Sequence, residues 1–500
     1  MLYFSKSKYC QFKQCPKACW LNKYRPELLS LDDSTIARMN AGNDVGDLAM
    51  GLFGDYVEVI ARTPDGRPDA NKTKALTKQY IAEGREIICE AAFGYNGLYC
   101  AVDILKKTEK GYAMYEVKSS TDPNKPVYLL DACFQKYVLE KSGLTVDGVY
   151  IVTLDKEYVF DGTLDLSKLF KITDISQRVA ENIGMVEGDL NRAEAILALR
   201  AEPAIDLSES CHYPYDCGFF GYCSRNLPSP SVFDLYGMDF KECVELYKKG
   251  VVSYADVSRC SEVNITPIRA LQLKYAHGKG GTHVDREGIK KYLSGLHYPL
   301  YFLDFETVQE PVPRYVGTKP FQQVPFQYSL HYVECEGGEL KHTEFLGQPE
   351  VDPRRALAEQ LVDDIPEDAC VLAFNKGFER GKIKALAEAF PDLSDRLMTI
   401  HANVVDLIDP FRSGYYYNGA MGGSFSVKVV LPAMFPGDPE LDYHNLEGVK
   451  KGDEAKDVFP KLLKMPPEER ERVRQGLLKY CWLDTYAMVK IWQALNDAVK

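Results

Sequence analysis

Apolar and polar positions alternate along residues 86–154 in a way that predicts a sheet with one helix. Three runs have the composition of strands, namely residues 86–93, 98–106 and 112–119. Asn96-Gly97, between the first two runs, is typical of a tight hairpin. The next segment, VYLLDACFQKYVLEKSG, repeats its apolar residues with helical spacing after Pro126 and ends at Gly143. A last apolar run at 148–154 completes a strand-strand-strand-helix-strand order.

Helical patterns flank this segment on both sides. We expect a helical lead-in over residues 1–26, a helix at 34–52 and a helix at 175–200. After the proline-rich stretch LPSPS, residues 229–295 favour short amphipathic helices with a loop at 277–283. This part is interpreted as a connector.

A second sheet pattern begins near Tyr298. The run YPLYFLDFET predicts a buried strand, CVLAF at 370–374 predicts another, and LLKYCWLDTYAMVKIWQAL near the C-terminus predicts a long helix. The fold class is therefore α/β. The expected domains are residues 1–226, the connector 227–295, and residues 296–500.

Composition narrows the class of protein. With 500 residues, 45% of them hydrophobic, the chain is long enough for two to four folded domains. The sequence contains no apolar run of membrane-spanning length, and its N-terminus lacks the features of a signal peptide, so we expect a cytoplasmic protein without a membrane partner. In a reducing compartment, the 14 cysteines indicate metal ligands and buried thiols, not a disulfide framework.

Charge is unevenly distributed. The net charge of −12 gives no support for nucleic-acid binding, yet residues 6–25 contain six basic residues and no acidic one. Four aromatic residues interrupt this stretch, namely Tyr9, Phe12, Trp20 and Tyr24. Such a segment could follow a phosphate backbone and stack on bases. An amphipathic helix with a solvated basic face explains the pattern equally well.

The first candidate site is the pattern D-x12-E-x-K formed by Asp103, Glu116 and Lys118. A hairpin turning at 108–111 places residues 103 and 116 opposite one another, and Glu116 and Lys118 then share a face of their strand. Two carboxylates can hold a divalent metal while the lysine positions or polarises a water molecule. A solvated cross-strand charge pair is the alternative interpretation.

The second candidate site consists of three cysteines, Cys211, Cys217 and Cys223, spaced as C-x5-C-x5-C. Either a tetrahedral zinc ion or an iron–sulfur cluster requires a fourth ligand. The other cysteine grouping is Cys10, Cys15 and Cys19.

Together these features resemble the iron–sulfur RecB-type nucleases, which have a PD-(D/E)XK, restriction-endonuclease-like core. The resemblance rests on Cys15-Pro16 followed by Trp20-Leu21, on the D…ExK pattern and on the three later cysteines, and it covers residues 1–226. It implies a 4Fe–4S cluster that clamps the two ends of the domain. Its ligands would be Cys15, Cys211, Cys217 and Cys223, with Cys10 and Cys19 as second choices and zinc as the alternative metal.

The sequence departs from this family at two places. Gln135 matches the glutamine of the motif Q-x3-Y, but Leu139 stands at the tyrosine position and Tyr137 is the nearest substitute. The family's early G-x-x-H is replaced by GNDVGDLA, so one metal ligand is either lost or supplied by Asp47. A weakened site is consistent with both changes.

The C-terminal part carries three short motifs: Asp304-x-Glu306, Asn375-x-x-Phe378-Glu379 and Tyr480-x3-Asp484. Each alone is more often a surface charge or a core tyrosine. In this order they resemble the tyrosine subtype of the DEDD exonucleases, which have a ribonuclease-H-like fold with a mixed sheet.

The DEDD resemblance implies a site with two Mg²⁺ or Mn²⁺ ions. The ligands would be Asp304, Glu306, Glu379 and Asp484, and Tyr480 would orient the attacking water. Glu379 stands where the family usually has aspartate, and Asp406 is a further acidic residue with an expected supporting role.

The two halves together resemble a family of bacterial two-nuclease proteins, through GSFSVKVVLP at 423–432 and YCWLDT at 480–485. We therefore expect a metal-dependent nuclease with two active sites, DNA favoured over RNA as substrate, and a 3′–5′ exonuclease at the C-terminal site. The alternative is a nucleic-acid-binding or regulatory protein with a structural cluster and one or both sites inactive.

Overall fold

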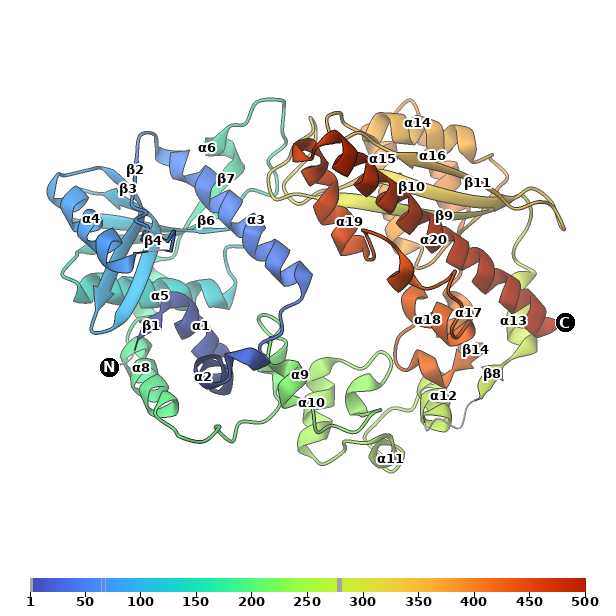
Figure 1. Ribbon diagram of the computed structural model, residues 1–500, viewed down its shortest axis with the longest axis horizontal. Helices are drawn as coiled ribbons and strands as arrows, with labels where there is room; N and C mark the ends of the chain where they lie inside the picture. The colour runs from blue at the N-terminus through green and yellow to red at the C-terminus, as the bar shows by residue number, and fades with distance from the viewer. Residues whose placement is uncertain (1–2, 64, 68, 277–280) are drawn as a thin grey trace. The chain divides into compact units, whose positions relative to one another are not determined.

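The computed structural model describes residues 3–63, 65–67, 69–276 and 281–500, and the chain forms two compact units (Figure 1). The first unit comprises residues 1–226 and 310–321, and the second comprises 227–309 and 322–500. Both are α/β structures with mixed sheets, as the sequence predicts. The first division falls at residue 226. Residues 310–321 of the expected C-terminal domain belong to the first unit, and the expected connector is part of the second unit.

The first unit is built on a seven-stranded sheet of order β2-β3-β4-β5-β6-β7, with β1 parallel to β4. Its strands are β1 (Phe4–Ser5), β2 (Val57–Glu58), β3 (Ile87–Tyr95), β4 (Leu98–Lys107), β5 (Tyr112–Lys118), β6 (Val146–Leu154) and β7 (Phe170–Asp174). Strands β3, β4 and β5 form the predicted antiparallel meander, and β6 then runs parallel to β5. Strands β1, β2 and β7 were not predicted because they are short or border loops.

The predicted helices of the first unit are present, two of them divided, and three further helices were not predicted. The helices are α1 (Lys6–Gln14), α2 (Pro16–Tyr24), α3 (Asp33–Ala49), α4 (Ala70–Ala82), α5 (Pro126–Lys141), α6 (Leu166–Leu169), α7 (Ser176–Asn182), α8 (Met185–Leu197) and α9 (Phe220–Cys223). Those not predicted are α4, α6 and α9. The lead-in is two helices because Pro16 starts a new helix at its first position and leaves Cys15 extended. The predicted helix at 175–200 is likewise divided, into α7 and α8.

Side chains on the two faces of this sheet form two separate cores. One core lies under α1, α2, α5, α7 and α8 and contains the buried residues Trp20, Met114 and Phe134. The other contains Val45 from α3 and Tyr115 from β5. Alternation along β5 therefore directs Glu116 towards α5 and leaves Val117 on the opposite face.

Strands β3 and β4 are both irregular near their middle. Ile88 and Ala91 both belong to the core under α5, so the alternation of faces shifts at Glu90, whose φ of 55° is left-handed. Val102 and Leu105 show the same shift around Asp103 on β4. Such an irregularity re-aims side chains from their regular directions, and here it affects two neighbouring carboxylates.

The second unit contains a five-stranded sheet of order β11-β10-β9-β12-β13. Its strands are β9 (Leu300–Gln309), β10 (Gln323–Val333), β11 (Lys341–Leu346), β12 (Cys370–Ala373) and β13 (Val404–Asp406). The first three pair antiparallel, and β12 and β13 continue the sheet in parallel with β9. A separate ribbon pairs β8 (Thr282–Val284) with β14 (Tyr416–Asn418).

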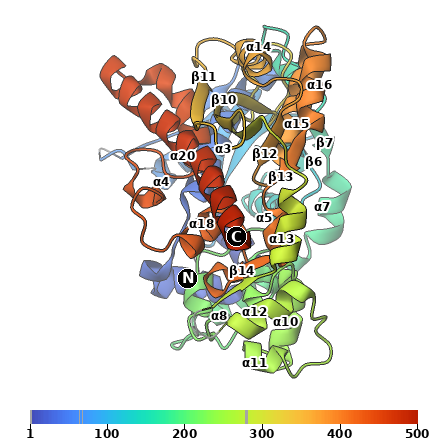
Figure 2. The same ribbon diagram turned by 90° about the vertical axis from the view of Figure 1, so that its right-hand side faces the viewer.

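Helices cover both faces of this sheet. The long C-terminal helix α20 (Pro467–Val499) crosses one face, and α14 (Arg354–Asp364), α15 (Gly377–Ala389) and α16 (Ser394–Ala402) cover the other (Figures 1 and 2). On β9, Leu303 and Phe305 enter the core with α14, α15 and α16. Phe302 contacts Trp492 of α20 with an edge-on ring geometry. The next even positions, Asp304 and Glu306, therefore face α20.

Shorter helices complete the second unit. The connector forms α10 (Phe240–Lys248), α11 (Tyr254–Val257), α12 (Pro267–Tyr275) and α13 (Arg286–Leu293); later come α17 (Asp409–Arg412), α18 (Val427–Met434) and α19 (Gly452–Val458). Gln272 of α12 donates a hydrogen bond to the carbonyl of Gly422, which joins the connector to the GSFS segment. The first four residues of the predicted loop 277–283 lie outside the described residues.

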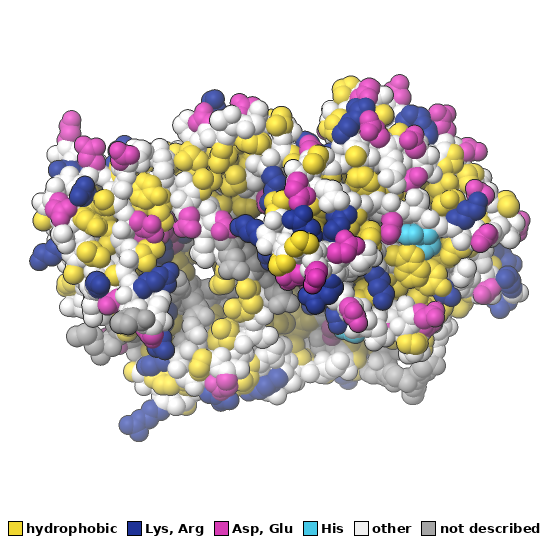
Figure 3. Space-filling view, turned by 45° about the horizontal axis from the view of Figure 1, so that its top comes forward, with side chains coloured by type: hydrophobic (Ala, Val, Ile, Leu, Met, Phe, Trp, Pro, Cys, Tyr) yellow, Lys and Arg dark blue, Asp and Glu magenta, His cyan; other side chains and the backbone are white. Residues whose placement is uncertain are grey.

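Surface and hydropathy add two observations. On the face shown in Figure 3, Lys and Arg side chains are interspersed with Asp and Glu. Among the helices of the described chain, none combines the length and the apolar character that crossing a membrane requires.

Candidate active sites

The hairpin of β4 and β5 brings the first predicted carboxylates together. Ile104 pairs with Tyr115, and continuing this register places Asp103 opposite Glu116. The backbone N–H of Val117 donates to Oδ2 of Asp103 at 2.7 Å, which fixes that carboxylate. The predicted alignment is therefore correct, and the turn closes as expected through a 2.9 Å hydrogen bond from the N–H of Thr108 to the carbonyl of Gly111.

Helix α5 supplies two further polar side chains to the same place. Lys118 donates to Oε1 of Glu116 at 2.7 Å and to Oδ2 of Asp131 at 2.6 Å. Gln135 donates from Nε2 to Oε2 of Glu116 at 2.6 Å and to Oδ1 of Asp131 at 3.0 Å. Asp103, Glu116, Lys118 and Gln135 thus converge. Asp131 was not predicted, although its i, i+4 spacing to Gln135 on a helix could have indicated it.

A second ammonium group enters this site from α1. The Nζ atom of Lys6 lies 2.8 Å from Oε1 of Glu116 and 3.6 Å from Oδ1 of Asp103. Glu116 is 1% exposed, so the site is a largely buried network of carboxylates and ammonium groups. Lys6 is distant in sequence and carries no motif, so sequence reasoning could not assign it to this site.

The two facing carboxylates, Asp103 and Glu116, have pKa values shifted in opposite directions. Burial and the neighbouring Glu116 raise the pKa of Asp103 to about 6. Burial opposes ionisation of Glu116 as well, but Lys118 and Lys6 lower its pKa well below its usual range. Burial and Asp103 also raise the pKa of Glu90, which the strand register places opposite Asp103, to about 7. Glu116 is therefore the permanently ionised member.

Tyr137 and Asp47, considered as substitutes for the family's tyrosine and histidine, lie outside the network of Asp103 and Glu116. The ring of Tyr137 lies near the ammonium of Lys141, and Leu139 is buried in the core. The aromatic ring beside Lys118 belongs to Tyr128, with Nζ 5.3 Å from its centroid. Asp47 is exposed on α3.

The basic stretch at 6–25 does not present most of its aromatic residues for base stacking, whereas Lys23 and Arg25 are exposed. Tyr9, Phe12 and Trp20 are buried in the core under α5, so they cannot stack on bases. Lys13 pairs with Asp189 at 2.8 Å, and Lys17 pairs with Glu202 at 2.8 Å. Three of the aromatic residues and several of the cations therefore serve the fold, because helices α1 and α2 are central to the first unit.

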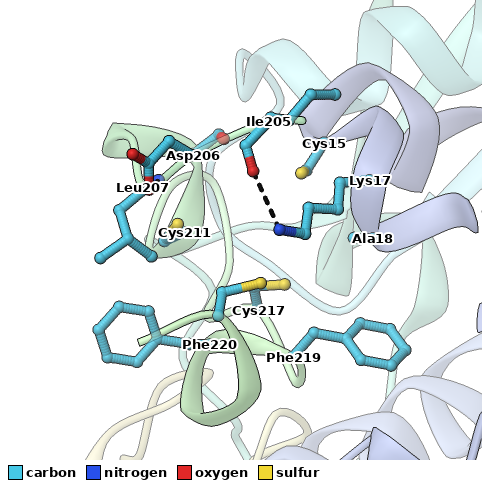
Figure 4. Close-up of a pocket in the computed structure, with 12 residues that line it drawn as sticks. Cys15, Lys17, Ala18, Ile205, Asp206, Leu207, Cys211, Cys217, Phe219 and Phe220 are labelled. Atoms are coloured by element: carbon cyan, nitrogen blue, oxygen red, sulfur yellow. Dashed lines mark hydrogen bonds between the residues drawn. The ribbon is translucent and has the colours of Figure 1, made fainter. Parts of the chain in front are cut away.

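The four cysteines that the RecB-type resemblance implies as ligands line a common pocket (Figure 4). Its lining includes Cys15, Cys211, Cys217 and Cys223, which brings the start of the first unit against residues 205–223. The second choices lie elsewhere: the thiol of Cys19 faces the carbonyl of Lys8, and burial raises the pKa of Cys10, which lies near Asp131 and Lys118. Cys15, the cysteine that the family resemblance implies, is thus the one that shares a pocket with Cys211, Cys217 and Cys223.

Within the described residues, three acidic side chains of the second unit form a group of potential metal ligands. Oxygen atoms of Asp304, Glu306 and Asp484 all lie within 4.8 Å of one another. Asp304 and Glu306 come from the same face of β9, and Asp484 comes from α20, which crosses that face. Burial and the other carboxylates raise the pKa of Asp304 well above its usual range. Burial raises that of Asp484 to about 6.

Tyr480 lies one helical turn before Asp484 and contacts an unpredicted lysine. The Nζ atom of Lys428, from α18, donates to the Tyr480 hydroxyl at 2.9 Å. Tyr443 donates its hydroxyl to Oδ1 of Asp484 at 2.5 Å. A Cβ atom added to Gly452 would meet the Glu306 carboxylate and the Tyr480 hydroxyl at 3.7 Å, so Gly452 borders the same space.

The fourth predicted acid, Glu379, is buried near this group. Leu372 pairs with Phe302, so the chain leaving β12 passes beside the end of β9 that carries Asp304. Glu379 is 3% exposed, and among the described side chains its Oε2 atom is one of those without a hydrogen-bond partner. Burial raises the pKa of Glu379 to about 8. Glu379 adds to the field that raises the pKa of Asp304 but is not one of the three residues within 4.8 Å.

Asp406 stabilises the turn before α15 by accepting hydrogen bonds from the backbone. Its Oδ1 accepts the N–H of Asn375 at 2.8 Å, and its Oδ2 accepts the N–H of Lys376 at 3.2 Å. Asn375 has a left-handed φ of 79°, which asparagine adopts more readily than most residues. Asp406 therefore holds the turn that begins α15 and leads to Glu379.

A cavity of about 410 Å³ adjoins these elements. Its lining combines aromatic and polar side chains, including Tyr236, Phe374, Asn375, Arg412, Ser424 and Phe425. Phe374 and Asn375 directly follow β12 and precede Glu379, and Val427, also in the lining, directly precedes Lys428. The GSFS segment thus forms one wall of the cavity.

Comparison with known protein families gives a match to part of the second unit. A family described as a domain of unknown function, DUF2779, matches residues 301–426. No curated protein matches the chain. The matched segment contains Asp304, Glu306, Glu379 and Asp406 and ends before α20.

Proposed function

We propose that the second unit is a two-metal 3′–5′ exonuclease acting on nucleic-acid ends, with DNA favoured over RNA. The observation that carries this proposal is the group of three carboxylates, Asp304, Glu306 and Asp484, within 4.8 Å of one another. Buried carboxylates at this spacing repel one another strongly unless cations or protons compensate their charge. Hard divalent cations with oxygen ligands, Mg²⁺ or Mn²⁺, match this donor set.

The sheet order supports the same proposal. Three antiparallel strands followed by two parallel ones, with the first strand in the centre, is the arrangement expected of a ribonuclease-H-like domain, and the acidic residues lie on the central strand. Glu379 adds a buried carboxylate oxygen without a hydrogen-bond partner among the described residues. A divalent ion would supply the missing interaction.

Each polar residue of the site has a defined task in this proposal. Two bound divalent ions would stabilise the attacking and leaving oxygens of an in-line displacement at phosphorus. Asp304, Glu306, Asp484 and Glu379 would hold them. Tyr480 would orient the attacking water through its hydroxyl, whose oxygen accepts a hydrogen bond from Lys428. Tyr443 would hold the rotamer of Asp484.

For the first unit we propose a second nuclease site of the PD-(D/E)XK type. Asp103 and Glu116 would be the metal ligands, Lys118 would polarise the attacking water, and Gln135 would orient Glu116. Support comes from the convergence of these four side chains in one buried network.

For the cysteine pocket we propose a 4Fe–4S cluster bound by Cys15, Cys211, Cys217 and Cys223. A single zinc ion with Zn–S bonds of about 2.3 Å holds its sulfur atoms roughly 3.8 Å apart. Within the described chain, no three of these cysteines bring their sulfur atoms within 4.8 Å of one another. An iron–sulfur cluster fits a wider spacing because each thiolate binds a different iron atom. Burial raises the pKa of Cys217 to about 11, so cluster binding must displace thiol protons.

A nuclease assay with two single variants tests both sites. Asp304→Ala and Asp103→Ala proteins would be compared with wild type on end-labelled single- and double-stranded DNA and RNA in the presence of Mn²⁺. Asp304→Ala should reduce 3′–5′ digestion about 100-fold or more, because an electrostatic element of the transition state is lost. The double variant, which carries both Asp103→Ala and Asp304→Ala, should lose the remaining nuclease activity.

Matched controls are Glu388→Ala, an exposed acidic residue of α15, and Glu140→Ala, an exposed acidic residue of α5. Both should retain wild-type rates. Equal digestion by wild type and the double variant would contradict the catalytic assignment. Retained nucleic-acid binding without hydrolysis in wild type would instead favour the alternative, a binding or regulatory protein with inactive sites.

A further inference from the structure

The ammonium of Lys6 lies where a divalent cation would bridge the carboxylates of the first unit. Its Nζ atom is 2.8 Å from Oε1 of Glu116 and 3.6 Å from Oδ1 of Asp103. Asp103 and Glu116 are also the two residues to which the proposed nuclease function assigns the metal. A metal ion and an ammonium group cannot both occupy this position, so the two cations compete.

The charges of the network show what removal of Lys6 would do. Three carboxylates, those of Asp103, Glu116 and Asp131, share the site with the ammonium groups of Lys6 and Lys118. Glu90, which the strand register places opposite Asp103, is a fourth carboxylate beside this set. If Lys6 withdraws, a divalent ion would replace the positive charge that Asp103 and Glu116 lose. Buried sites favour such compensation because uncompensated charge there is costly.

The two lysines differ in their freedom to leave. Lys118 is held between Glu116 and Asp131 by two hydrogen bonds of 2.7 and 2.6 Å. Lys6 donates one hydrogen bond, to Glu116, and its side chain is 26% exposed, compared with 18% for that of Lys118. It is also the first residue of α1, directly after the two-residue strand β1. Lys6 is therefore the cation that can move outwards.

We propose that Lys6 is a built-in competitor for the divalent metal of the first unit, so that metal binds there only when the Lys6 ammonium withdraws from Asp103 and Glu116. The inference rests on the proposed function, which makes these two carboxylates metal ligands. It predicts a low affinity for Mn²⁺ in the first unit and a marked gain when the ammonium is removed. The first site would then need a higher metal concentration for half-occupancy than it would without Lys6.

Binding of Mn²⁺, followed by electron paramagnetic resonance of the free ion, tests this proposal on the full chain. Asp304→Asn and Asp484→Asn would be present throughout to weaken binding by the second unit. Lys6→Met should raise the Mn²⁺ affinity about 10-fold or more, in the range typical of residues that control metal ligands. Lys6→Arg keeps a cation and should bind Mn²⁺ as weakly as the parent protein.

Lys8→Met is the matched control, because Lys8 lies on the same helix but its ammonium is near the ring of Tyr3. It should leave Mn²⁺ binding unchanged. Thermal unfolding provides a second measurement: without metal, Lys6→Met should unfold at a lower temperature than the parent, and Mn²⁺ should raise that temperature more than it does for the parent. An unchanged or lower Mn²⁺ affinity of a folded Lys6→Met protein would overturn the proposal.

A further variant separates this failure from failure of the proposed function. Asp103→Asn in the Lys6→Met background should abolish the gain in Mn²⁺ affinity. If the gain persists, Asp103 is not a ligand and the metal assignment of the first unit is wrong. If Lys6→Met produces no gain, the metal assignment can stand but Lys6 does not compete.

Discussion

At the residue scale, Glu379 shows how the second site depends on its charge state. Its carboxylate is buried, its pKa is raised to about 8 by burial, and Oε2 has no hydrogen-bond partner among the described residues. Without metal, this residue therefore favours the protonated form up to mildly alkaline pH. With a metal ion bound nearby, the charge of the ion would compensate the ionised Glu379 carboxylate directly. Protonation of Glu379, metal binding and the stability of the second unit are therefore linked.

This coupling predicts a pH-dependent effect of Glu379→Gln. The folded state binds the Glu379 proton more tightly than the unfolded chain does, so its contribution to stability is complete below about pH 4.5 and is lost as the pH rises through 8. Glutamine does not ionise, so the Glu379→Gln variant does not lose stability in this way as the pH rises. In EDTA at pH 8, Glu379→Gln should exceed wild type in unfolding free energy by on the order of 2–4 kcal/mol, and the difference should shrink at pH 5.

Urea unfolding followed by tryptophan fluorescence measures this difference, because Trp482 and Trp492 both lie on α20 in the second unit. Glu388→Gln, an exposed change on the same helix, should leave the pH dependence as in wild type. Mg²⁺ should stabilise wild type more than Glu379→Gln. Identical pH profiles for wild type and Glu379→Gln would show that the Glu379 carboxyl is not perturbed by burial.

At the scale of elements, a buried polar joint of hydrogen bonds between helix α20 and strand β10 positions Asp484, the carboxylate that α20 contributes to the second site. The hydroxyl of Thr485, next to Asp484, lies 2.7 Å from the hydroxyl of Ser329 and 2.8 Å from Nδ1 of His331. Burial lowers the pKa of His331 to about 3, so the ring is neutral and can share its hydrogen bonds with these hydroxyls. This buried polar joint sets the axial position of α20 on the sheet.

Removal of the Thr485 hydroxyl should therefore weaken the joint. Thr485→Val preserves shape but leaves Ser329 and His331 without a shared partner, which should lower the unfolding free energy by about 1–3 kcal/mol. Exonuclease activity should also fall, because Asp484 is the next residue on the helix. Thr399→Val on α16, where the hydroxyl bonds to the carbonyl of Asp395 near solvent, is the matched control and should cost less. Equal unfolding free energies for both variants would contradict the role of this joint.

At the scale of the whole molecule, the cysteine pocket closes the first unit on itself. Cys15 lies between α1 and α2, while Cys211, Cys217 and Cys223 come from the end of that unit nearly two hundred residues later. A cluster bound by all four would join the first helices to the last segment and constrain the unfolded chain. The second unit has no part in this closure, since the lining residues all belong to the first unit.

Protein purified without oxygen should therefore be brown and contain about four iron atoms per chain. Cys15→Ser and Cys217→Ser should lose the colour and the iron, and the first unit should become sensitive to proteolysis while the second unit stays resistant. Cys335→Ser, a change at an exposed cysteine of the second unit, should retain the iron. A colourless protein with one zinc ion per chain would contradict the cluster.

Much of the fold was predictable because it is encoded locally. The strands β3, β4 and β5, helix α5 and the alternation that turns Asp304 and Glu306 to one face all follow from periodicity within single segments. The register of Asp103 against Glu116 follows from the turn between them. The break at Cys15 was missed because Pro16 can continue a predicted helical region in sequence while it starts a separate helix in space.

By itself, the sequence determined the α/β class, the hairpin that aligns Asp103 with Glu116, and which acidic residues lie on a common strand or helix face. Only the tertiary structure decided which distant side chains join them: Lys6 from α1 in the first unit, and Lys428 and Tyr443 beside α20 in the second. The physical reason is that periodicity and turns act between neighbours in the chain, whereas charge compensation and burial depend on residues that folding alone brings into contact.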